Sequence, residues 1–163
     1  MEKEFVNLLN AHPGILYKIC HLYCGDEEDR KDLFQEMVLQ LWKAFPAFRR
    51  EAKASTWMYR VALNTAVSNF RQGRRNPRPA PLSSAALQIP DLATGAAGHE
   101  EMAQLYAAIE HLTAVEKALV MLYLDEKTYE EMAIILGIGK SNVGTKLSRI
   151  RAKLERMMKP VAR

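Results

Sequence analysis

The segment 128–156 constrains this chain most, because it holds two helical patterns separated by a short break that contains glycine. The first pattern opens at Thr128 with Glu131 three residues later, a spacing typical of a capping box. Gly137 follows the last apolar residues and can take the left-handed conformation that ends a helix. Ser141 is a suitable N-cap for the second pattern. The segment therefore predicts two short helices joined by a tight turn.

The second of these helices has an apolar stripe and a polar face. At about 100° per residue, one narrow stripe contains Val143, Leu147, Ile150 and Leu154. The opposite face carries small or hydrogen-bonding side chains with cations at its edges: Ser141, Asn142, Thr145, Ser148 and Arg149, flanked by Lys146, Arg151 and Lys153. Such a face suits a major groove, with bases ahead and phosphates on either side. The pattern favours a helix-turn-helix over an ordinary helical hairpin with a solvated basic face.

Composition is typical of a folded chain without a membrane span. Its 163 residues suffice for one ordinary domain or two small ones, and 48% of them are hydrophobic. No apolar run approaches the roughly 18 residues that cross a bilayer, and the N-terminus does not resemble a signal peptide. We therefore expect a cytoplasmic protein with no direct membrane insertion.

The charge is unevenly distributed along the chain. A net charge of +4 permits nucleic-acid binding without requiring it. Residues 139–163 contain eight cations and one acid, whereas residues 26–36 contain six acids and two cations. The C-terminal end therefore suits a phosphate backbone better than the segment near the N-terminus does.

A proline-rich segment divides the chain. Four prolines lie between residues 77 and 90, among serines and alanines, and no helical or strand period persists there. We predict a flexible linker at 76–99 between domains at 1–75 and 100–163. Both flanking parts show helical periods, so the expected fold is all-α, with two small helical domains.

The expected helix at 29–45 has one unusual face. Its core face is predicted to contain Leu33, Phe34, Met37, Val38 and Leu41. The opposite stripe contains Asp32, Gln35, Glu36, Leu39 and Lys43. An apolar residue among polar ones is typical of a protein-binding face, because apolar anchors give affinity and rim charges give register. An incidental exposed leucine is the alternative.

The expected helix at 56–72, capped by Ser55 or Thr56, also has two contrasting faces. Its core face is predicted to contain Met58, Val61, Ala62, Thr65 and Ala66. The other stripe holds Trp57, Arg60, Asn64, Ser68 and Arg71. An exposed aromatic ring beside cations suits single-stranded nucleic acid, because unpaired bases stack on rings while cations follow the backbone. A tryptophan buried in the core is the alternative.

No catalytic constellation is visible in the sequence. The four histidines are scattered, and no phosphate-binding glycine loop occurs. Cys20 and Cys24 share a helical face with His21 nearby, which allows a metal site or a redox pair. We favour core residues, because cysteine often serves as a small buried hydrophobe. We therefore expect no enzyme activity, no cofactor and no small-molecule substrate.

Three segments together resemble the extracytoplasmic-function (ECF) group of bacterial sigma-70 factors. They are DLFQEMVLQLWKAFPAF at 32–48, STWMYRVALNTAVSNFRQGRR at 55–75, and the helix-turn-helix at 128–156. They are similar to the family's polymerase-binding helix, its promoter-melting helix and its −35 reader. Their order, the linker between them and the total length also match.

The resemblance implies a role for each surface. Region 2, a helical bundle at 1–75, would bind core RNA polymerase through Asp32, Gln35, Glu36 and Leu39. It would read a melted −10 strand through Trp57, Arg60, Asn64 and Arg71, with a flipped base in the loop at about 48–55. Region 4, at 100–163, would read the −35 duplex through Ser141, Asn142, Thr145, Lys146, Ser148 and Arg149. An anti-sigma protein is a further expected partner.

Two glycines depart from the family pattern. Gly139 stands where serine is frequent, and Gly144 stands where many members have lysine or arginine. A glycine inside a helix costs about 0.8–1.0 kcal/mol relative to alanine. Because Gly144 also removes one possible DNA contact, another member's −35 preference does not transfer to this chain.

Two other classes of function compete with the sigma-factor hypothesis. A plain helix-turn-helix regulator would bind duplex DNA unaided, but this hypothesis does not explain the stripe around Leu39 or an exposed Trp57. A metal-dependent enzyme or redox sensor would depend on the two cysteines. Replacement of both by serine would then abolish function.

Overall fold

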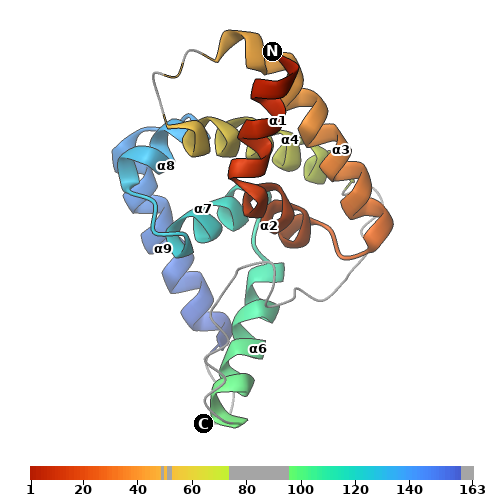
Figure 1. Cartoon of the computed structure of the whole chain (residues 1–163). Helices are drawn as coiled ribbons and strands as arrows, with labels where there is room; N and C mark the ends of the chain where they lie inside the picture. The colour runs from red at the N-terminus through yellow and green to blue at the C-terminus, as the bar shows by residue number, and fades with distance from the viewer. Residues whose placement is uncertain (49, 51–52, 74–95, 159–163) are drawn as a thin grey trace, which may run out of the picture.

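The computed structural model describes residues 1–48, 50, 53–73 and 96–158, and it is all-α over these ranges, as predicted (Figure 1). The N-terminal part contains α1 (Glu2–Ala11), α2 (Pro13–Tyr23), α3 (Glu27–Ala44), a 3-10 turn η1 (Phe45–Ala47) and α4 (Ala54–Gly73). The C-terminal part contains α6 (Ala96–Glu110), α7 (Ala114–Leu124), α8 (Tyr129–Leu136) and α9 (Lys140–Met158). None of the described helices is long and apolar enough to cross a membrane.

Local sequence signals set the boundaries of the N-terminal helices. Pro13 is the first residue of α2, where its missing N–H costs nothing. Asp26 caps α3 by accepting a hydrogen bond from the amide of Asp29 at 2.9 Å. Helices α2, α3 and α4 pack against one another around a core that includes Ile19, Leu33, Met37, Leu41, Met58 and Ala62.

Two details predicted for this part are wrong. Phe34 was expected in the core but is 44% exposed, because the buried stripe of α3 is narrower and consists of Leu33, Met37 and Leu41. Helix α4 begins at Ala54, so the residues at 55 and 56 lie inside the helix instead of capping it.

The C-terminal part confirms most of the predicted helix ends. The predicted Thr128–Glu131 capping box is formed, with two hydrogen bonds of 3.0 Å each. A second capping box, Thr113–Glu116, starts α7 with hydrogen bonds of 2.9 and 3.2 Å. Gly137 ends α8 with φ of 68°, in the left-handed region that favours glycine.

The predicted N-cap of the reading helix is wrong. Helix α9 begins at Lys140, and the carbonyl of Gly139 accepts the hydrogen bond from the amide of Val143 at 3.1 Å. Glycine is tolerated at an N-cap, so the helix starts before Ser141. The Ser141 side chain is consequently exposed on the first turn instead of being used as a cap.

The two parts of the chain share one continuous core. Helix α4 packs directly against α7 and α8, as the centre of Figure 1 shows. Tyr59 and Leu63 are almost fully buried, although neither was expected in the core. Their side of α4 is a second apolar face that meets the C-terminal helices. The two predicted helical parts therefore pack against each other in this structure.

The predicted linker lies mostly outside the described residues. Residues 74–95 are not described, so the flexibility predicted for 76–99 has no structural counterpart here. Helix α6 begins at Ala96, inside the range assigned to the linker. It runs beside α9 at the lower end of the molecule (Figure 1).

Candidate nucleic-acid interface

Helix α9 presents all its predicted −35 side chains to solvent. Val143 and Ile150 are buried and fix the rotation of the helix about its axis. The exposed residues are Ser141, Asn142, Thr145, Lys146, Ser148 and Arg149. The Thr145 hydroxyl donates to the Ser141 carbonyl at 3.1 Å, which ties its Oγ1 to the first turn. The structure therefore gathers these six residues on one accessible face, as the amphipathic pattern predicted.

The cations beside this face are not equivalent. Lys153 was expected at its edge, but its Nζ lies 3.0 Å from the Glu116 carboxylate and is only partly accessible. This contact braces α9 against α7. Burial alone would raise the pKa of Glu116, but the Thr113 amide and the Lys153 ammonium outweigh it and hold that pKa below its usual value. Lys146, Arg149 and Arg151 are exposed, and Arg151 Nε lies 3.5 Å from the Glu155 carboxylate in an exposed ion pair.

Gly144 lies under an aromatic ring from α8. A Cβ atom at Gly144 would lie 3.5 Å from Cε2 of Tyr129, which is ordinary van der Waals contact. The ring is itself 42% exposed. Alanine therefore fits at this position.

Helix α4 brings three of its four predicted −10 residues to an exposed stripe. Arg60, Asn64 and Arg71 are exposed, as expected. Trp57 is only half-buried, and its ring stacks on Phe48 with centroids 4.6 Å apart and planes at 24°. One face of the Trp57 ring is therefore covered by Phe48. Trp57 was predicted to be exposed, but in the structure it is partly covered, and it lies at the start of this stripe.

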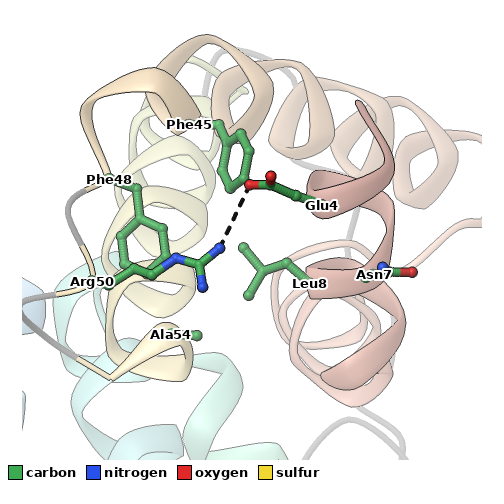
Figure 2. Close-up of a pocket in the computed structure, with 7 residues that line it drawn as sticks. All are labelled: Glu4, Asn7, Leu8, Phe45, Phe48, Arg50 and Ala54. Atoms are coloured by element: carbon green, nitrogen blue, oxygen red, sulfur yellow. Dashed lines mark ion pairs between the residues drawn. The ribbon is translucent and has the colours of Figure 1, made fainter. Parts of the chain in front are cut away.

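A pocket of about 440 Å³ has as one of its walls Phe48, the residue that stacks on Trp57. Figure 2 shows its walls, formed by α1, by the segment after α3 and by the first residue of α4: Glu4, Asn7, Leu8, Phe45, Phe48, Arg50 and Ala54. An ion pair between Arg50 Nη2 and Glu4 Oε2, 3.6 Å long and exposed, crosses its mouth. The loop part of this pocket was expected from sequence, but the contribution of α1 was not. Nothing in the pattern of α1 indicated that Glu4 and Asn7 would face the loop.

Helix α3 carries the predicted polymerase-binding stripe on its outer surface. Asp32 and Gln35 are exposed and Leu39 is 45% exposed. The predicted exposure of an apolar residue among polar ones is therefore confirmed. Glu36 is half-buried and accepts a hydrogen bond from Gln40 Nε2 at 3.1 Å.

This stripe borders an apolar groove between α1 and α3. The groove measures about 540 Å³ and is lined by Glu2, Phe5, Val6, Phe34, Gln35, Val38, Leu39 and Trp42. Val6, Phe34 and Trp42 are exposed in it, and none of the three was predicted as a site residue. Phe34 and Trp42 could have been recognised because α3 has more large apolar residues than one buried stripe accommodates.

The cysteines lie in or beside the core. The Cys20 thiol donates to the Arg30 carbonyl at 3.5 Å. Burial raises the pKa of Cys20 to about 12 and that of Cys24 to about 11, so both are protonated thiols at neutral pH. The His21 ring instead contacts the Tyr17 ring, with centroids 4.0 Å apart. These surroundings agree with the interpretation of the cysteines as core residues.

Two family models match the chain in the order of its two helical parts. A Sigma-70 region 2 model matches residues 8–76, which include α2, α3 and α4. A Sigma-70 region 4 model matches residues 102–154, which include α7, α8 and most of α9. The surfaces described above therefore lie within the matched regions, except for the part of the α1 surface that precedes residue 8.

Curated relatives and solved structures agree with these matches. The ECF RNA polymerase sigma factor SigG of Mycobacterium tuberculosis is 28% identical over 162 residues, which cover 83% of this chain and 44% of SigG. SigM of the same species is 26% identical, over 94% of this chain and 76% of SigM. The sigma factor RpoE of Bartonella quintana, solved with the anti-sigma factor NepR, has a TM-score of 0.67 at 20% identity, over 99% of this chain and 98% of RpoE. This chain belongs to the ECF group of the sigma-70 family, whose members are transcription initiation factors.

Proposed function

We propose that this protein is an RNA polymerase sigma factor that directs promoter-specific initiation of transcription. The observation that carries the proposal is the presence of both family regions in one chain, each with its expected surface exposed. A stand-alone DNA-binding regulator needs the reading helix but has no use for the outer stripe of α3. The two parts of the chain that act in this way are the predicted domains at 1–75 and 100–163.

Helix α9 is the proposed −35 reader. Four of its six exposed residues, Ser141, Asn142, Thr145 and Ser148, have short polar side chains. The helix backbone can therefore approach base edges closely. The other two, Lys146 and Arg149, lie where phosphates would flank the groove. Because Lys153 is engaged with Glu116, the proposed phosphate contacts are Lys146, Arg149 and the exposed Arg151.

Helix α4 and the neighbouring pocket are the proposed −10 site. Arg60, Asn64 and Arg71 form a polar track that suits the backbone and edges of a single strand. The pocket has the half-buried Phe48 as an apolar wall for a base and polar atoms from Asn7, Glu4 and Arg50 for recognition. The exposed Arg50–Glu4 ion pair contributes little stability, so an entering base displaces it at low cost.

The stripe on α3 is the proposed polymerase contact. Leu39 offers an exposed apolar anchor, and Asp32, Gln35 and Glu36 supply polar groups around it. The acidic character of this face favours a basic partner surface.

The remaining features of the proposal follow from this role. The protein acts in the cytoplasm, where polymerase and promoter DNA are, and the chemistry of RNA synthesis belongs to the polymerase, so the chain is not an enzyme and needs no cofactor or small-molecule substrate. An anti-sigma protein is a proposed partner, and RpoE in its complex with NepR provides the structural parallel.

The test is polymerase-dependent binding to a promoter fragment that carries both elements. The wild-type protein should co-elute with bacterial core polymerase and bind the fragment much more tightly in its presence than alone. The double replacement Lys146→Ala with Arg149→Ala should preserve co-elution but weaken binding of the fragment. Unaided, polymerase-independent binding that matches the polymerase-dependent affinity would identify a plain helix-turn-helix regulator instead.

A further inference from the structure

Asp125, the residue that ends α7, is held by two residues from the N-terminal part. Its Oδ1 accepts a hydrogen bond from Lys18 Nζ of α2 at 2.7 Å, and its Oδ2 accepts one from the Tyr59 hydroxyl of α4. Lys18 is only 5% exposed, so its ammonium is largely removed from water and depends on this partner. The Lys127 ammonium lies 5.3 Å from the centroid of the Tyr59 ring and adds a cation on the same side.

The other end of α7 is also held by the N-terminal part. The Tyr23 hydroxyl of α2 donates to the carbonyl of Ala114, the first residue of α7, at 2.6 Å. Tyr23 is buried beside the Phe70 ring of α4. One helix of region 4 is thus fixed at both ends by polar contacts from region 2, with the shared core between them.

The arrangement is too small to engage both promoter elements together. Elements centred near −35 and −10 are separated by about 25 base pairs, or roughly 85 Å of straight duplex at about 3.4 Å per pair. A compact chain of this length has a radius of gyration of about 15 Å and a diameter of roughly 40 Å. The α9 face and the α4 stripe are both exposed in this arrangement, so each can bind its own element, but they cannot span both.

We propose that the contacts of Asp125 with Lys18 and Tyr59, together with the Tyr23–Ala114 hydrogen bond, form a latch that holds the free protein closed. The latch must break before region 2 and region 4 bind the two elements of one promoter. This inference rests on the proposed function for its consequence, but the latch itself is a property of the free chain. Opening exposes Lys18 and Asp125 to water, which offsets part of the lost interaction and makes the latch reversible.

The latch is tested first by small-angle X-ray scattering of the full-length free protein. Asp125→Asn removes the charge that pairs with Lys18, and Glu126→Gln removes the adjacent, exposed acid as a matched control. The wild type and the control should have a radius of gyration of about 15 Å, whereas the Asp125→Asn protein should approach about 20 Å or more as the two parts separate. Helix content, measured by circular dichroism, should be unchanged in all three.

An Asp125→Asn protein that stays as compact as the control with full helix content would overturn the latch. If this variant loses helix content, Tyr23→Phe decides in the same assay, because it removes only the hydroxyl at the other end of α7. An unchanged radius of gyration in Tyr23→Phe would then overturn it equally.

A second measurement separates failure of the latch from failure of the proposed function. Binding to an isolated −35 duplex should be the same for wild type and Asp125→Asn, because the α9 face is exposed in both. Polymerase-dependent binding to a two-element promoter should instead reach half-saturation at a several-fold lower concentration of the variant. If Asp125→Asn expands but neither it nor the wild type binds a promoter, the inference of a latch stands and the proposed function is refuted.

Discussion

Replacement of Leu39 tests whether the outer face of α3 binds polymerase. Leu39 is 45% exposed in the free protein, so a partner can bury about half of a leucine side chain. Full burial of leucine contributes about 1.5–3 kcal/mol, and half of that gives about 0.7–1.5 kcal/mol. Leu39→Ala should therefore weaken binding of core polymerase by about 3- to 12-fold.

Leu39→Asp should weaken the binding of core polymerase more than Leu39→Ala does. It removes the apolar contact and forces a carboxylate to lose water at the interface, which costs at least about 2 kcal/mol more. The combined loss is roughly 100-fold or greater. Because the position is exposed, the substitution should change the free energy of unfolding by no more than about 0.5 kcal/mol. Repulsion between the new carboxylate and Glu36 should lower it by a few tenths of a kcal/mol more.

The assay is direct titration of core polymerase with labelled protein, monitored by fluorescence anisotropy. Tyr17→Asp is the matched control, because Tyr17 is 48% exposed on α2 and lies outside the predicted stripe. The control should bind within about 2-fold of wild type. Equal affinities for Leu39→Asp and Tyr17→Asp would refute the assignment of this face.

Three further predictions concern stability, each measured by reversible denaturation of the full-length protein. Thr128→Ala removes the hydroxyl that accepts a 3.0 Å hydrogen bond from the Glu131 amide, and should cost about 1 kcal/mol, whereas an unchanged midpoint would show that this cap contributes nothing. Gly144→Ala should stabilise α9 by up to about 1 kcal/mol, because a Cβ fits against Tyr129, and destabilisation would contradict that fit. Burial alone would raise the pKa of Asp125, but the hydrogen bonds from Lys18 and Tyr59 outweigh burial. The pKa of Asp125 therefore lies below its usual value. Its stabilisation should be complete above about pH 4 and lost as the pH falls through the folded-state pKa, and Asp125→Asn should remove this component.

Local signals in the sequence predicted the helix-turn-helix and its boundaries well. A capping box or a helix-ending glycine acts within a few residues, so Thr128, Glu131 and Gly137 adopt the expected roles whatever surrounds them. The exposure of Leu39 followed from periodicity alone. The N-cap at Gly139 was missed because glycine and serine compete for that role at nearly equal cost.

The remaining features depend on how the two parts of the chain pack, which periodicity does not specify. Tyr59, Leu63 and Phe70 share an apolar stripe at helical spacing, and this stripe could have indicated a second buried face on α4. The partner of that face could not be inferred, because it lies across a proline-rich segment of unknown path. Lys18 is the clearest case, since a lysine within an apolar helix gives no sign that an aspartate more than a hundred residues away will neutralise it.

In vitro transcription tests the central claim most directly. Bacterial core polymerase is combined with a promoter library, with and without this protein, and the transcript starts are sequenced. We expect new starts that depend on the protein and share two short upstream elements, near −35 and −10. Starts that are identical with and without the protein, from a preparation that is folded and mixed with active core polymerase, would contradict the account.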